Sequence, residues 1–115
     1  MSCVGVITSM EVTAHQVRVN NKFLCTLKTY DGWIIRLIPS ANVARHPRAE
    51  TLLHKAEHLR WMAQEGIMMV ERGNLEKATR WMGYIEGSLV QLGFATLEEI
   101  QMLDILSYVP EETVA

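Results

Sequence analysis

The spacing of apolar residues divides the chain into two blocks. In the second block they recur every three or four positions, the period of one helix face, first over residues 52–70 and again over 75–92. We therefore predict one helix over 47–72 and a second over 74–92, and the short turn between them makes the two antiparallel neighbours. The seam of the second helix consists of Leu75, Ala78, Met82, Ile85, Leu89 and Leu92.

Local signals mark the ends of these helices. Pro47 suits a first helical turn, and Gly73-Asn74 combines a C-cap glycine with an N-cap asparagine. Gly93 ends the second helix in the same way. Thr96 and Glu99 have capping-box spacing, which predicts a short third helix over 97–108 and a tail over 109–115.

The first block, residues 1–39, is rich in β-branched residues, which favours strands. Asn20-Asn21 and Tyr30-Asp31-Gly32 interrupt it where hairpin turns would fall, and Pro39 ends it. We therefore predict an α+β fold in a single domain. An N-terminal antiparallel β-meander of three strands, or four if Val4–Thr8 pairs, precedes the helical hairpin and the short third helix.

Composition narrows the class of protein. The chain has 115 residues, 49% of them apolar and 21% charged, which is typical of one globular domain. No apolar run approaches the ~18 residues of a membrane span. Residues 1–10 lack the Lys or Arg of a secretory signal, and two cysteines cannot form a disulfide framework. We expect a cytoplasmic protein, with the native start at Met1 or Met10 left open.

Charge is divided unevenly along the chain. Residues 1–60 hold eight Lys or Arg against four Asp or Glu, whereas residues 61–115 hold three against nine. This split favours self-association and disfavours general nucleic-acid binding. The third helix also carries two apolar faces, one with Ile100, Leu103 and Leu106 and another with Met102 and Ile105. Burial in a partner chain would explain the second face, as would packing between sheet and hairpin. We predict a homo-oligomer.

His54, Glu57 and His58 match the H-x-x-E-H pattern of inverted zinc peptidases. A peptidase also needs a third ligand and a cleft, for which this chain is short. The apolar stripe places these histidines opposite the core, so we interpret them as facing solvent or an interface. We expect no catalytic residues, no metal ligands and no cofactor, and whether His54 and His58 bind a metal stays open.

Basic residues gather at the start of the helical block. Arg45 and Arg48 flank the predicted helix start, where free N–H groups favour an anion, and Arg36 on the last strand could add a third guanidinium. The alternative is that these arginines are solvated loop residues.

Both long helices also carry an arginine next to a tryptophan. Arg60-Trp61 lies on the first helix, and Arg80-Trp81, followed by Tyr84, lies on the second. In such a pair the tryptophan can stack on a base while the arginine holds its phosphate. The alternative is that the tryptophans lie at the edge of the hydrophobic core. Gly83 and Gly87 indicate close approach of a ligand or of another helix. The candidate ligand-binding residues are Arg36, Arg45, Arg48, Arg60, Trp61, Arg80, Trp81 and Tyr84.

Within residues 52–100, the strings HKAEHLRWMAQEG and ERGNLEKATRWMGYIEGSLVQLGFATLEEI resemble the C-terminal helical hairpin of small accessory proteins of tailed bacteriophages. The layout of a sheet followed by helices is similar to the phage sponge proteins that counter the Thoeris defence. This resemblance implies sequestration of cyclic ADP-ribose-type signals or cyclic dinucleotides without hydrolysis. No ligand motif of that family matches residue by residue, so no site is transferred.

Two functions from different classes follow. The first is a non-enzymatic binding protein that sequesters a small anionic nucleotide-like ligand in an infected bacterium. The second is an inhibitor or adaptor that blocks a host or defence protein through the apolar third helix and the acidic C-terminal half.

Overall fold

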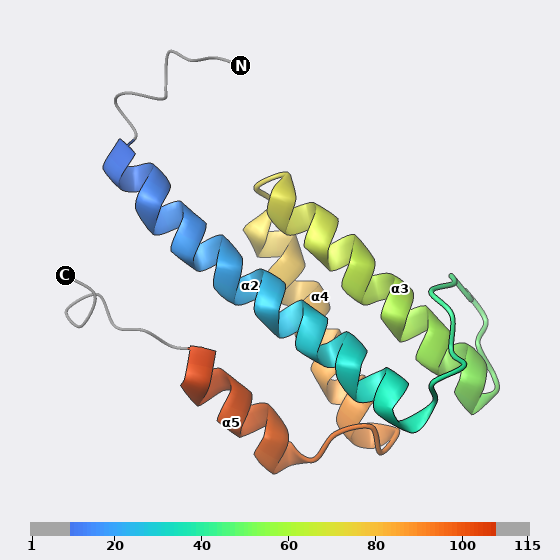
Figure 1. Cartoon of the computed structure of the whole chain (residues 1–115). Helices are drawn as coiled ribbons and strands as arrows, with labels where there is room; N and C mark the ends of the chain where they lie inside the picture. Colours follow the sequence, from blue (N-terminus) through green and yellow to red (C-terminus); the bar gives the residue numbers. More distant parts are fainter. Residues whose placement is uncertain (1–9, 108–115) are drawn as a thin grey trace.

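A computed structural model describes residues 10–107 of the chain, with side chains over residues 14–103, as a bundle of four helices. These are α2 (Met10–Leu37), α3 (Leu52–Glu71), α4 (Leu75–Gln91) and α5 (Leu97–Ser107). Each runs antiparallel to the one before it, and α2 packs against α3, α4 and α5 (Figure 1). No strand occurs in the described part of the chain.

The predicted N-terminal β-meander is wrong. Over residues 10–37 the chain forms one 28-residue helix, and the proposed turns at Asn20-Asn21 and around Gly32 are helical residues. The reason is a stripe of helical period, because Leu27, Tyr30 and Ile34 are all fully buried against the other helices. Tertiary burial of this stripe outweighs the strand preference of the β-branched residues around it. The proposed strand at Val4–Thr8 lies outside the described residues.

Local bonds make the threonines of α2 compatible with a helix. The hydroxyls of Thr26 and Thr29 donate to the carbonyl oxygens of Lys22 and Cys25, each at 2.8 Å. The hydroxyl of Tyr30 donates to the Glu86 carboxylate, which ties α2 to α4.

None of the described helices is both long and apolar enough to cross a bilayer.

The helical hairpin has the seam and caps that its sequence indicates. Ala78, Ile85 and Leu89 of the predicted seam are buried in the core. Gly73 and Gly93 adopt φ values of +83° and +84°, where a side chain would be strained. After each glycine an N–H bonds five residues back, from Asn74 to the Met69 carbonyl oxygen and from Phe94 to that of Leu89, both at 2.8 Å.

The start of α3 differs from the prediction. Residues 47–51 belong to a loop, and the helix begins at Leu52 with Thr51 as its N-cap. The Thr51 hydroxyl accepts the N–H of His54 at 3.0 Å, so this cap, and not Pro47, fixes the helix start. The loop between α2 and α3 consequently spans residues 38–51.

The last helix is anchored at its N-terminus. Thr96 and Glu99 form a reciprocal capping box, with bonds of 2.9 and 3.0 Å. The Glu99 carboxylate also pairs with Arg36 of α2 at 2.9 Å. Ile100 is buried and Met102 is 55% exposed, so the two faces of α5 have different surroundings. The side chains of Ile105 and Leu106 lie outside the described residues.

Helices α2 and α3 approach each other closely at Gly66. A Cβ added at Gly66 would lie 2.9 Å from a methyl carbon of Leu27. Gly66 therefore allows the two helices to pack closely in the centre of the bundle.

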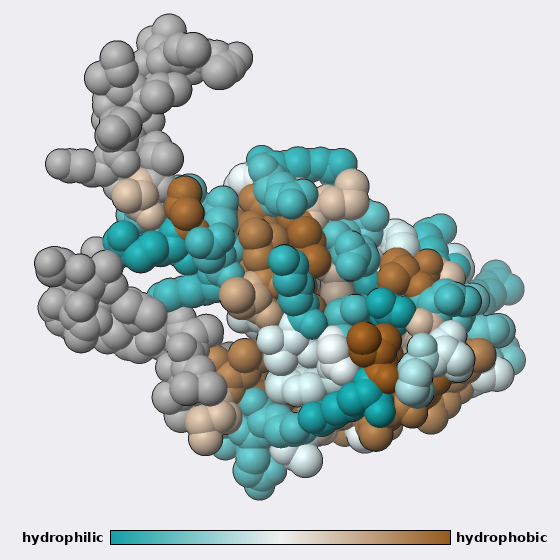
Figure 2. Space-filling view, viewed as in Figure 1, coloured by the Kyte–Doolittle hydropathy of each residue, from teal (hydrophilic) through white to brown (hydrophobic). Residues whose placement is uncertain are grey.

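The surface is mainly hydrophilic on the face drawn in Figure 2, with separate apolar groups between the polar ones.

Candidate functional site

The loop of residues 38–51 folds back onto α3 and is held there by the carboxylate of Glu57. Oε2 of Glu57 accepts the backbone N–H of Asn42 at 2.9 Å, and Oε1 contacts Nε2 of His46 at 2.8 Å. These hydrogen bonds lower the pKa of Glu57, the Asn42 N–H most and His46 next. Because an ionised carboxylate only accepts, His46 Nε2 is the donor.

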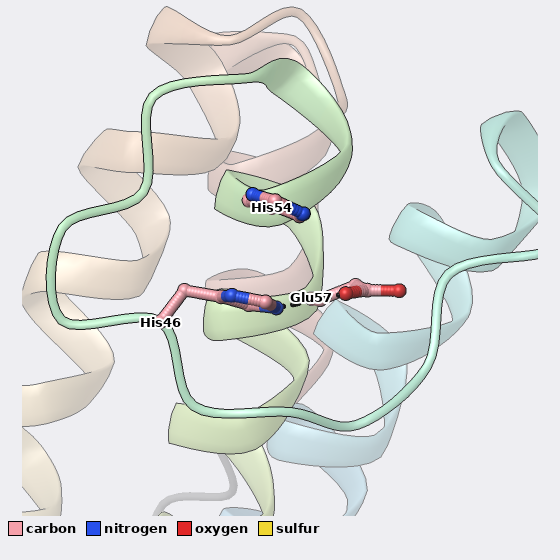
Figure 3. A group of neighbouring side chains, drawn as sticks. All are labelled: His46, His54 and Glu57. Carbon is pink, nitrogen blue, oxygen red and sulfur yellow. Dashed lines mark hydrogen bonds and ion pairs between the residues drawn. The ribbon is translucent and has the colours of Figure 1, made fainter.

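His46, His54 and Glu57 form a cluster where this loop meets the first turns of α3 (Figure 3). The two imidazole rings stack with centroids 4.3 Å apart and an angle of 11° between planes. One potential ligand atom from each residue lies within 4.8 Å of the other two. Two nitrogens and one carboxylate oxygen are a donor set that divalent transition metals bind.

His58 is not part of this cluster. Its Nδ1 accepts the backbone N–H of His46 at 2.9 Å, and its ring stacks on Trp61 at 5.3 Å between centroids. Burial lowers the pKa of His58, and electrostatic interactions with Arg45 and His46 lower it further. Because Nδ1 of His58 accepts a hydrogen bond, this nitrogen carries no proton. The potential ligand atoms that lie within 4.8 Å of one another include one of His54 but none of His58, so the described residues do not bring the two histidines of the H-x-x-E-H pattern to one shared position.

A groove runs beside His58, between the loop, α3 and α4. One hollow of about 570 Å³ opens over the tryptophans, and a second of about 350 Å³ continues from it toward the C-terminal end of α4. The two hollows share Pro47, His58 and Tyr84, so we call them together the α3–α4 groove. The first hollow is lined by Arg45, Pro47, His58, Trp61, Met62, Arg80, Trp81 and Tyr84.

The charged side chains that line the α3–α4 groove are cationic. Arg45 and Arg80 line the first hollow and Lys55 the second, while no Asp or Glu appears among the described residues that line either. Arg80 has an exposed contact of 3.8 Å with Glu76, one helical turn away, which leaves its charge largely uncompensated. The groove is thus electropositive in a chain whose net charge is −2.

The aromatic side chains of the groove have different surroundings. Trp61 and Trp81 contact each other with centroids 5.9 Å apart, and the guanidinium of Arg45 lies 5.6 Å from the Trp61 ring. Lys77 lies 5.7 Å from the Trp81 ring. Tyr84, by contrast, is 60% exposed and lines both hollows. Its ring is the open aromatic surface of the groove.

The structure brings five of the eight sequence-predicted ligand residues together in this groove, namely Arg45, Trp61, Arg80, Trp81 and Tyr84. The other three lie elsewhere. Arg36 pairs with Glu99 and also donates to the Phe94 carbonyl oxygen at 3.1 Å. Arg60 turns to Asp31 of α2, and exposed Arg48 lines neither hollow.

Sequence reasoning missed several groove residues and the role of Glu57. Lys55 and His58 are three positions apart in α3, so one face of that helix carries both into the groove. This spacing could therefore have indicated from the sequence that Lys55 and His58 lie on the same face of the helix. The burial of Glu57 had no local signal, because it depends on Asn42 and His46 folding back from the loop.

Gly83 and Gly87 face open space, with no atom within 4 Å of an added Cβ. The expected close packing of another helix on these glycines is therefore absent from the described part of the chain.

In comparisons with protein-family models, curated proteins and solved structures, no match to this chain was found. The resemblance to phage proteins stays a prediction.

Proposed function

We propose that this protein binds and sequesters a small nucleotide-derived anion in the α3–α4 groove. The observation that carries the proposal is the meeting, in one electropositive hollow, of Trp61 from α3, the Arg80–Trp81 pair from α4 and Arg45 from the loop. These residues are distant in sequence, and a nucleotide needs such a combination of cations and flat aromatic surfaces.

The cations of the groove suit a phosphate or pyrophosphate. Arg45 and Arg80 line the first hollow and Lys55 the second, so an anionic group could be contacted from the loop and from both helices. Arginine donates in a fork that matches two phosphate oxygens, and lysine adds a point charge. With no carboxylate in the described lining, nothing there repels an anion.

The open aromatic ring suits the base. The Trp61 ring contacts His58 and Arg45 within the chain, whereas Tyr84 is mostly exposed. We therefore assign base stacking to Tyr84 first, with Trp81 beside it at the same hollow. His58, which lines both hollows, adds a hydrogen-bonding group.

The proposed activity is binding without hydrolysis. A cyclic ADP-ribose-type signal or a cyclic dinucleotide would be held and released unchanged, in the cytoplasm of a phage-infected bacterium. Capture of a defence signal is the use that the resemblance to phage sponge proteins implies. The stoichiometric consequence is that protection would require at least one binding site per signal molecule.

A calorimetric titration of the full chain with cyclic ADP-ribose-type nucleotides and cyclic dinucleotides tests this function. Arg45→Ala and Arg80→Ala should each weaken binding by about ten- to a hundredfold, the effect of one lost charge-assisted contact. Arg72→Ala is the matched control, because Arg72 is an exposed arginine at the far end of α3. It should bind like the wild type.

The bound ligand should then be recovered by denaturing the complex and identified by mass spectrometry. An intact ligand is the expected result. A cleaved product would show that the protein is an enzyme and not a binding protein. Equal affinities for Arg80→Ala and Arg72→Ala would remove the groove as the site. Absence of binding across the nucleotide panel would end the proposal.

A second candidate function is favoured by the surface of α5. Leu97 and Met102 are 58% and 55% exposed on a short helix whose N-terminus carries two glutamates. Exposed apolar side chains beside acidic ones are typical of a protein-binding surface. An inhibitor or adaptor acting on a host or defence protein would lose its target with Met102→Glu and keep it with Arg80→Ala.

A further inference from the structure

We propose that His46, His54 and Glu57 form a binding site for one divalent transition metal, of which Zn²⁺ is the representative. The expectation from the sequence was that no metal ligand is present. The site combines part of the H-x-x-E-H helix with a histidine from the loop, a combination that only the fold produces. Of its three residues, His46 also lines the second hollow of the α3–α4 groove, whereas His54 and Glu57 line neither hollow.

Metal binding at this cluster requires the two stacked imidazole rings to separate. Ligand atoms around tetrahedral zinc lie about 3.4 Å from one another, given metal–ligand distances of about 2.0–2.2 Å. Here Nε2 of His46 and Oε1 of Glu57 are 2.8 Å apart, and all three donor atoms lie within 4.8 Å. A metal would replace the hydrogen bond between His46 and Glu57, and the ring of His54 would rotate out of its stack on His46, because the in-plane lone pairs of two parallel rings do not converge on one ion. Since His54 is exposed, its ring has room to do so.

The surrounding bonds orient the ligands as in metal sites. Oε2 of Glu57 is held by the Asn42 N–H at 2.9 Å, which leaves Oε1 directed at the cluster. Ligating carboxylates are commonly fixed in this way by a second hydrogen bond. The backbone of His46 is held in turn by its 2.9 Å bond to His58. The backbone N–H of His54 is held by the Thr51 hydroxyl at 3.0 Å, while its side chain is exposed.

The donor set selects the class of metal. Two imidazole nitrogens and one carboxylate oxygen suit Zn²⁺, Co²⁺ and Ni²⁺, whereas Mg²⁺ and Ca²⁺ prefer all-oxygen sites. Binding requires His46 to present Nε2 without its proton, which either moves to Nδ1 or leaves to solvent. The metal would then fasten the 38–51 loop to α3, and that loop carries Arg45 and Pro47 of the groove.

The test uses the full chain without an affinity tag, stripped by a chelator and titrated with Zn²⁺ and Co²⁺. We expect one metal per chain, a visible Co²⁺ absorption of four-coordinate type, and a melting temperature several degrees higher with excess Zn²⁺. Mg²⁺ should have none of these effects. His54→Ala should weaken Zn²⁺ binding at least about tenfold.

The matched control is His15→Ala, because His15 is an exposed histidine on α2 outside the cluster. It should bind Zn²⁺ like the wild type. Equal Zn²⁺ affinity for His54→Ala and the wild type, or no binding at micromolar metal, would overturn the site. If His54→Ala does not fold, His54→Gln keeps a side chain of similar length without the imidazole and serves the same comparison. These readouts use metal alone and are independent of any nucleotide.

Discussion

The guanidinium of Arg60 on α3 holds the carboxylate of Asp31 on α2 through two hydrogen bonds of 2.6 and 2.9 Å. A third bond, of 2.5 Å, runs from Arg60 to the Ala41 carbonyl oxygen in the 38–51 loop. Both charged side chains are less than 20% exposed. One arginine thus joins α2, α3 and the loop that borders the groove, so its role is structural.

Removing this arginine should destabilise the fold. Arg60→Ala leaves the carboxylate of Asp31 partly buried without its partner, and we expect a loss of about 2–3 kcal/mol in the free energy of unfolding. Urea denaturation followed by circular dichroism measures it. Arg80→Ala, on an exposed arginine, should change stability by less than about 0.5 kcal/mol. Similar stabilities for the two variants would contradict the structural role of Arg60.

The sequence predicts Arg60 as a ligand-binding residue, but the partner that Arg60 has in the structure cannot be predicted from its neighbours in sequence. Its partner Asp31 lies 29 positions away, and only the packing of α2 on α3 brings the two together. Glu57 is a second case, since its burial depends on the loop. By contrast, Gly73, Gly93 and the Thr96–Glu99 box form as expected, because caps depend on a few adjacent residues.

The error over α2 has a related cause. Its buried stripe of Leu27, Tyr30 and Ile34 has helical period, but it lies among β-branched residues and possible turn residues that favour strands. The seam of α4 has no such competing signal, and its helix was predictable. Trp61, Arg80, Trp81 and Tyr84 were predicted because Arg–Trp neighbours are visible in the sequence, and Arg45 because it lies near an expected helix start. Their meeting in one hollow is not visible in the sequence.

Two glycines in helix interiors should respond oppositely to alanine. Gly83 faces open space, so Gly83→Ala should stabilise the protein by about 0.5–1 kcal/mol through helix propensity alone. Gly66→Ala gains the same propensity but places a Cβ 2.9 Å from fully buried Leu27, so its net effect should be neutral to destabilising by about 1 kcal/mol. Thermal or urea unfolding of both variants gives the comparison. A Gly66→Ala protein stabilised as much as Gly83→Ala would mean that α2 and α3 are further apart.

The Arg36–Glu99 pair should make stability depend on pH. The pKa of Glu99 is lowered, first by the Thr96 N–H and then by Arg36. A depressed folded-state pKa adds stability above the ordinary value of 4.5, and this is lost as pH falls through the folded-state value. Glu99→Gln should therefore be less stable than the wild type near neutrality, with the difference vanishing in acid. Unfolding curves from about pH 3 to 7 would show a constant difference if the pair contributes nothing.

Self-association is expected from the charge split and from the exposed apolar residues. Val17, Leu37, Leu97 and Met102 are each about half exposed, and the two halves of the chain carry opposite net charge. Light scattering coupled to size exclusion at micromolar concentration should give at least twice the 13.1 kDa of one chain. Raising the salt concentration should weaken the assembly if charge contributes. A mass of one chain at all concentrations would contradict it.

Substitutions of Tyr84 distinguish nucleotide binding, which includes stacking of the base, from attraction of any anion by charge alone. Its ring is 60% exposed, so Tyr84→Ala should leave the free energy of unfolding within about 0.5 kcal/mol of the wild type. If a base stacks on that ring, the same change should lower nucleotide affinity by about tenfold, while Tyr84→Phe keeps the ring and the affinity. Inorganic phosphate is the control ligand, since it has no base and should bind all three proteins alike. Unchanged nucleotide affinity in Tyr84→Ala would leave Arg45 and Arg80 as a general anion site and remove the base from the proposal.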